Sequence, residues 1–303
     1  MPTGKGKAPD VFRYHYAIVS RIPNSFKDSS LKQKEPAKPI DLEKARQQHE
    51  EYVETLRKLG IDVLELPLDE RHPDCVFVED TAVVINGTAL ICRPGASSRL
   101  GEVAVIRQTL RKELGLKIVE VDNDKATIDG GDVLWTGKEI VVGLSGRTNQ
   151  EGAQAIAKAF PEYATCMVRV EGALHLKSLM SMAGPELIAV SRSPAAQKVL
   201  KRVQEQVTYS YMILTVEEEE AANMLYANGM RVHLPDTTIP KSFPIIENKL
   251  DFQNRYAQDI SELQKADGDL TSMSILIQKV KHPKNFSSGV SDEDLGDFPV
   301  VTL

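Results

Sequence analysis

Polar residues recur at a steady interval along this chain, each at the start of an apolar segment. Asp80, Asp129, His175, Asn223 and Ser272 are separated by 49, 46, 48 and 49 residues. The apolar pattern around each of them is typical of a strand, a turn, a second strand, a helix and a third strand. A period of this length predicts a radial repeat or a solenoid, because each unit can bury its apolar face only against its neighbours.

The two ends of the chain carry complementary parts of one such unit. Tyr14–Ser20 alternates as a strand, and Asp41 precedes an amphipathic helix that is followed by a strand expected to be buried at Ile61–Leu66. Leu270–Val280 is predicted to be a strand that opens the same unit. We therefore expect a closed ring, because an open array would need separate capping repeats. Closure would bring the five polar residues together around one axis.

The repeat covers most of the 303 residues and divides the chain simply. We expect a flexible N-terminal arm at 1–12, a single domain at 13–280 and a C-terminal extension at 281–303 that is polar and acidic. The loop 27–39 is rich in Lys, Ser and Pro and is interpreted as a mobile surface loop.

Composition excludes several classes of partner. The net charge of −6 offers no basic surface for nucleic acid or an anionic membrane, and no apolar run is long enough to span a bilayer. Three widely spaced cysteines, Cys75, Cys92 and Cys166, do not form a disulfide or zinc pattern. With no apolar segment behind the basic N-terminus, these features predict a cytoplasmic protein.

Five motifs occur together in the order in which one known family has them. They are Pro73–Asp80, Arg93–Arg99, Ala126–Leu134, Leu144–Gln150 and Leu174–Ser178. Together they resemble the dimethylarginine dimethylaminohydrolases over roughly 14–280. The resemblance implies an α/β fold, a five-bladed ββαβ propeller with pseudo-fivefold symmetry, which agrees with the period above. It also implies hydrolysis of N-omega-methylated arginines to citrulline and methylamines, in arginine metabolism and nitric oxide regulation. No cofactor or metal is implied, and the expected state is a monomer or weak homodimer.

The resemblance assigns three catalytic positions. The family has a cysteine nucleophile where this chain has Ser272. His175 matches the general acid and base, and Asp129 matches the carboxylate that orients it. On the residues alone, a histidine between two leucines is more often an ordinary core residue. The Asp-Gly-Gly-Asp segment at 129–132 could equally be a bulged turn that feeds a strand.

Three acidic residues match the family's substrate contacts. Glu79 and Asp80 match the pair that binds the guanidinium, and Asp74 matches a further contact. Carboxylates suit this ligand because its planar fork of donors can bond them bidentately. An acidic cluster is usually a solvated turn, but the apolar residues 76–78 between these acids favour a site.

Four further positions complete the expected substrate contacts. Arg99 and Arg147 match residues that recognise the amino-acid end of the substrate, although either could be a surface arginine. Leu31 matches a residue of the lid, and Ala266 matches a backbone contact.

The serine at position 272 has two interpretations. In the first, the serine is an engineered replacement of the cysteine, made to hold substrate without turnover. In the second, the chain is a natural relative that binds arginine-like ligands without catalysis. We favour the first, because a site long out of use would be expected to lose its other members as well. Cys75 and Cys92 are interpreted as small buried apolar residues and not as replacement nucleophiles. A deiminase acting on an unmethylated guanidino compound is the alternative enzyme.

Overall fold

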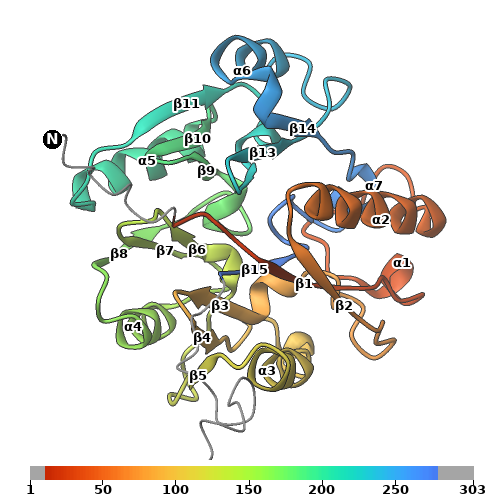
Figure 1. The fold of residues 1–303 in the computed structure, drawn as a ribbon, viewed down its shortest axis with the longest axis vertical. Coiled ribbons are helices and arrows are strands. Elements are labelled where there is room, and N and C mark those ends of the chain that lie inside the picture. Colours follow the sequence, from red (N-terminus) through yellow and green to blue (C-terminus); the bar gives the residue numbers. More distant parts are fainter. Residues whose placement is uncertain (1–10, 279–303) are drawn as a thin grey trace, which may run out of the picture.

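The computed structural model describes residues 11–278, and in these residues five three-stranded sheets form a ring (Figure 1). The strands, in chain order, are β1 Tyr16–Ser20, β2 Asp62–Leu66, β3 Ala82–Ile85, β4 Thr88–Ile91, β5 Lys117–Glu120, β6 Val133–Trp135, β7 Ile140–Leu144, β8 Thr165–Arg169, β9 Met180–Gly184, β10 Leu187–Ser191, β11 Met212–Val216, β12 Leu225–Ala227, β13 Met230–His233, β14 Arg255–Ala257 and β15 Ile275–Ile277. The helices are α1 Phe26–Ser29, α2 Leu42–Lys58, α3 Val103–Lys112, α4 Gln150–Ala159, α5 Pro194–Gln206, α6 Phe243–Lys249 and α7 Ser261–Gln264.

Every sheet has the same topology. Its first two strands pair antiparallel, and its second and third strands pair parallel across a helix, as in β3-β4-β5 with α3 between β4 and β5. Figure 1 shows α2 to α6 at the circumference and the first strand of each sheet nearer the centre. The expected five-bladed ββαβ propeller is confirmed.

The ring closes through the two ends of the chain. β15 pairs antiparallel with β1, with Ala17 opposite Leu276, and β1 pairs parallel with β2. The Asp41 side chain caps α2 by accepting a hydrogen bond from the backbone N–H of Lys44. The strand expected to be buried at 61–66 is instead an edge strand with two exposed residues, because β2 has a neighbour on one side only.

The recurring polar residues lie in short turns that precede the first strand of each sheet. The 3₁₀ turns η1 Val78–Thr81, η3 Gly130–Asp132, η4 Leu176–Ser178 and η5 Glu220–Ala222 contain or adjoin the first four of these residues. The expectation of a strand from Leu270 is wrong. Residues 270–273 form a turn in which the Ser272 amide bonds the Asp269 carbonyl and the Asp269 amide donates to Ser272 Oγ.

Apolar side chains pack between the sheets and their helices. Helix α2 buries Ala45, Tyr52 and Leu56 on one face, and the Tyr52 hydroxyl bonds Ser274 Oγ at 2.8 Å. Of the expected arm, only residues 11 and 12 are described, and Phe12 is buried with its ring 5.4 Å from that of Tyr226. The expected extension at 281–303 lies outside the described residues. Every helix within residues 11–278 is too short or too polar to cross a bilayer.

Close packing at Gly152, in the first turn of α4, gives a stability prediction. A Cβ there would lie 2.0 Å from the backbone carbonyl oxygen of Thr127, so an added methyl group must displace the main chain. Gly152→Ala should therefore lower the free energy of unfolding by about 1–3 kcal/mol, although alanine is the better helix former. Urea denaturation measures the difference. Gly146→Ala is the control, because its Cβ would meet no atom within 4 Å; equal stability of both variants would contradict the prediction.

Candidate active site

One small cavity collects nine of the ten residues expected at the site. Its volume is about 30 Å³. The expected residues among those that line it are Leu31, Asp74, Asp80, Arg99, Asp129, Arg147, His175, Ala266 and Ser272. They come from four of the five blades and from the loop before α2, so the cavity exists only in the closed ring.

His175 points one ring nitrogen, Nε2, towards two buried carboxylates. Its Nε2 is 2.9 Å from Asp129 Oδ2 and 3.8 Å from Asp80 Oδ1, and all three side chains are buried. The backbone holds both acids: Gly95 N–H donates to Asp129 Oδ1, and Gly131 N–H donates to Asp80 Oδ1. The imidazole is therefore fixed in position by groups that are themselves fixed.

This arrangement favours the protonated histidine. Burial disfavours the imidazolium, but the charge of Asp80 and the hydrogen bond to Asp129 outweigh burial and raise the pKa of His175 to about 9. Burial likewise disfavours the Asp80 carboxylate, yet the charges of His175 and Arg99 hold its pKa below the usual value. At neutral pH, His175 is a cation beside an anion, which suits a proton donor.

Arg99 is a buried member of the same network. Its Nη1 donates to Asp80 Oδ2 at 2.6 Å, its Nε to Glu102, and its Nη2 to Glu102 and to the Phe77 carbonyl. These bonds hold Asp80 from the side opposite His175. Recognition of the ligand's amino-acid end by Arg99 and Arg147 stays a prediction.

A loop closes the cavity from outside. The Leu31 amide donates to Asp74 Oδ1 at 2.9 Å, and the Gln33 amide donates to Asp267 Oδ2. A volume of about 30 Å³ has room for only a few water molecules, so an amino acid cannot enter unless these contacts open. The loop 27–39, expected to be a lid, thus lies over the site in a closed position.

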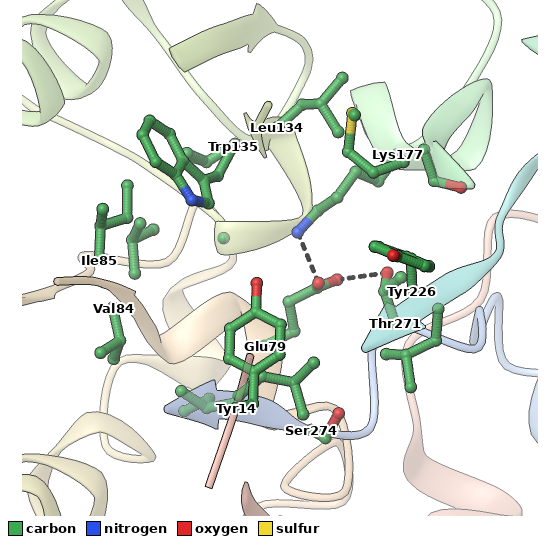
Figure 2. Close-up of a pocket in the computed structure, with 18 of the residues that line it drawn as sticks. Tyr14, Glu79, Val84, Ile85, Leu134, Trp135, Lys177, Tyr226, Thr271 and Ser274 are labelled. Carbon is green, nitrogen blue, oxygen red and sulfur yellow. Dashed lines mark hydrogen bonds and ion pairs between the residues drawn. The ribbon is translucent and has the colours of Figure 1, made fainter. Parts of the chain in front are cut away.

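Glu79, the tenth expected site residue, and Asn223, one of the five recurring polar residues, do not line this cavity. The Glu79 carboxylate bonds Lys177 Nζ and Thr271 Oγ1 and lines a second cavity, shown in Figure 2, so it does not lie beside Asp80 in the first. Asn223 bonds the Lys177 carbonyl and both the amide and the hydroxyl of Thr271, so it positions its neighbours.

Three acidic residues belong to the site and were missed from the sequence. Asp267 lines the cavity and holds the loop at Gln33. Asp269 accepts a hydrogen bond from Ser178 Oγ at 2.9 Å, which links the turn that contains Ser272 to the turn after His175. Asp132 accepts the Leu176 amide and holds that same turn from the other side. The sequence could have indicated Asp267 and Asp269, because the Asp-Gly-Asp segment at 267–269 lies only a few residues before Ser272.

The Ser272 hydroxyl accepts a hydrogen bond from the Asp269 amide at 3.1 Å. Within the described part of the chain, no hydrogen bond joins it to His175. Cys75 and Cys92 do not line the cavity, and burial raises the pKa of both thiols, which makes them poor nucleophiles. Asp80, Asp129 and His175 also offer ligand atoms within 4.8 Å of one another, but His175 would have to lose its proton before the set could hold a divalent cation.

Sequence comparisons match this chain to a known family. The family described as N,N dimethylarginine dimethylhydrolase, eukaryotic, matches residues 20–248. A human protein named putative hydrolase DDAH2 is 36% identical over 251 residues, covering 80% of this chain and 87% of that protein. The N(G),N(G)-dimethylarginine dimethylaminohydrolase of Pseudomonas aeruginosa is 31% identical over 264 residues, covering 85% and 98%.

Solved structures show the same fold. The Pseudomonas aeruginosa enzyme, as a cysteine-to-serine mutant complexed with citrulline, superposes with a TM-score of 0.76 at 28% identity, covering 88% of this chain and 100% of that one. An arginine dihydrolase domain of cyanobacteria, at 17% identity and a TM-score of 0.73, shares the architecture. Fold and site together define an amidinohydrolase of the α/β-propeller class. The chain belongs to the dimethylarginine dimethylaminohydrolase family.

Asp269 gives the site a measurable pH dependence. Burial raises the pKa of Asp269 to about 7, only partly opposed by its bond to Ser178. The folded protein therefore holds this proton more tightly than the unfolded chain, and stability falls as pH rises from about 4 to 7. Asp269→Asn should raise the free energy of unfolding at pH 8 by about 1–2 kcal/mol and leave it nearly unchanged at pH 4.5. Urea denaturation at both pH values tests this; an equal change at both would contradict it.

Proposed function

We propose that this chain binds N-omega-methylated arginines in the cavity between Asp80, His175 and Ser272. We further propose that it is the serine form of an enzyme that, with a cysteine at position 272, hydrolyses methylated arginines to citrulline and methylamines. The observation that carries the proposal is the convergence of nine expected site residues on one cavity beneath a loop. Family membership supports the substrate class.

Asp80 and Asp74 would hold the guanidinium. Both carboxylates are buried and line the cavity, and a buried cation needs such partners to replace its lost water. Burial raises the pKa of Asp74 despite nearby Arg99. A positively charged ligand would therefore be the natural counter-ion for this carboxylate. The Leu31 amide occupies Asp74 in the closed state, so binding and loop movement are linked.

The reaction needs a nucleophile and one proton carrier. A thiolate at 272 would attack the guanidinium carbon, and His175, as a cation, would donate its proton to the departing amine nitrogen. The neutral imidazole would then take one proton from water, whose oxygen attacks the same carbon. The C–S bond breaks to return the thiolate, and the remaining O–H proton passes to solvent as citrulline forms. Asp129 would hold the imidazole in place through both proton transfers.

Serine interrupts this scheme at its first step. A thiol can ionise beside an imidazolium, whereas a serine hydroxyl needs a neutral base to remove its proton. His175 has a pKa of about 9 and carries its own proton at neutral pH. The site can therefore bind and orient a substrate that it turns over very slowly.

The proposal extends to setting and assembly. We propose a cytoplasmic monomer or weak homodimer that acts in arginine metabolism and nitric oxide regulation. All three cysteines of the chain are unpaired, which supports a reducing environment.

Restoring the sulfur is the direct test of the chemistry. Ser272→Cys should release citrulline from methylated arginine at a rate at least 10³-fold above the parent chain, because a thiolate replaces an alkoxide. The release of citrulline and dimethylamine is measured with and without EDTA, and the two products should appear in equal amounts in both.

Side-by-side rates separate the alternatives. Arginine and agmatine as better substrates than the methylarginines would favour a deiminase. A Ser272→Cys protein that binds methylarginine in calorimetry and stays inactive would contradict the dimethylaminohydrolase assignment and favour a binding protein.

His175→Ala in the Ser272→Cys background tests the proton carrier. Turnover should fall by at least 10³-fold, while the dissociation constant for methylarginine should change little, because Asp74 and Asp80 remain. Calorimetry and steady-state kinetics on the same preparation measure both quantities. Comparable rates with and without the imidazole would contradict the role of His175.

A further inference from the structure

A second cavity lies on the ring axis at the opposite end from the candidate active site. Its lining includes residues of the first strand of every sheet, namely β3, β6, β9, β12 and β15. The active-site residues Asp80, Asp129, His175 and Ser272 come just before four of these strands. Since each strand leads away from its polar turn, the two cavities occupy the two ends of the axis.

A charged pair lines the second cavity. Glu79, Lys177 and Thr271 line the second cavity, and Figure 2 shows Lys177 and Thr271 both directed at the Glu79 carboxylate. Burial raises the pKa of Glu79, and the charge of Lys177 opposes this rise. The inner end of the cavity is thus an ion pair that is neutral overall, with both hydrogen-bond donors and acceptors.

The walls around this ion pair are apolar and aromatic. Figure 2 shows Tyr14, Trp135 and Tyr226 around the cavity together with Val84 and Ile85. The volume is about 150 Å³, five times that of the active-site cavity. Apolar protein cavities of roughly this volume accept one benzene ring.

The ion pair selects the charge of a ligand. Aromatic walls beside a carboxylate would suit a cation, but Lys177 already lies on the Glu79 carboxylate and would repel one. An anion would likewise be repelled by the Glu79 carboxylate. Adding a net charge to a partly buried neutral pair is costly, whereas a neutral group that donates to Glu79 and accepts from Lys177 satisfies both.

We propose that this cavity is a second ligand site, separate from the guanidino site, for a neutral single-ring aromatic compound with a carboxamide-like head group. The ring lies among Trp135, Tyr226 and Val84, and the head group bonds Glu79 and Lys177. This inference does not depend on the proposed function, because it uses none of the side chains that line the active-site cavity.

Benzamide is the test ligand, and the chain contains its own reporter. Trp135 lines the cavity and is the single tryptophan of the sequence, so binding should change its fluorescence saturably. Benzamide should bind at least tenfold more tightly than benzoate or benzylammonium, with calorimetry as the second measurement. A charged analogue that binds as tightly as benzamide would overturn the proposed ligand class.

Cavity-filling variants locate the binding. Val84→Phe should weaken benzamide binding at least tenfold, and Leu276→Phe on the neighbouring β15 is a second variant if the first does not fold. Val105→Phe is the matched control, because Val105 is an exposed residue of α3 that does not line this cavity. Retained affinity in a folded filling variant would overturn the site.

Saturating citrulline distinguishes the two cavities. Benzamide affinity should be unchanged within twofold in its presence, whereas competition between the two would show that benzamide enters the guanidino site and would overturn the proposal. If citrulline itself does not bind, the proposed function is contradicted. The fluorescence of Trp135 still shows whether benzamide binds in the second cavity.

Discussion

The pairing of β15 with β1 closes the ring, and the position of every candidate catalytic residue depends on that closure. Ser272 lies in the turn before β15, whereas Asp80, Asp129 and His175 lie before the first strands of other blades. No two of these residues are near in sequence, so only the closed ring gives them a common cavity. The backbone bond from the Glu79 amide to the Ser272 carbonyl joins the last turn to the first.

Charge organises the site once the ring is closed. A histidine buried alone would lose its proton, but His175 has Asp129 at 2.9 Å and Asp80 at 3.8 Å. Asp80 in turn shares its charge between His175 and Arg99, and Glu102 compensates the rest of the guanidinium. Removing one member would leave another buried charge unpaired, which couples the stability of the site to its chemistry.

The interval between polar residues predicted a radial repeat or a solenoid, and the complementary chain ends predicted the closed ring that brings Asp80, Asp129, His175 and Ser272 together. The interval could not predict where adjacent side chains point. Glu79 and Asp80 are neighbours in a 3₁₀ turn, whose side chains project about 120° apart, so one faces each cavity.

Other local details depend on contacts that the spacing of residues along the chain does not predict. The Asp-Gly-Asp turn continues through Ser272 by side-chain and backbone bonds, which is why the strand begins only at Ile275. The bonds of Arg99 to Asp80 and of Leu31 to Asp74 likewise join residues whose proximity follows from the fold and not from their patterns.

The surroundings of position 272 fit the proposed thiolate better than a serine hydroxyl. The Asp269 amide donates to the hydroxyl oxygen, as it would to a thiolate, and nothing in the described cavity accepts a proton from that oxygen. His175 supplies positive charge and a proton, which stabilises a thiolate but cannot create an alkoxide. Sulfur and oxygen at this position would therefore differ little in shape and greatly in function. In the proposed mechanism, the raised pKa that would make His175 an acid for the leaving amine would also leave Ser272 without a neutral base.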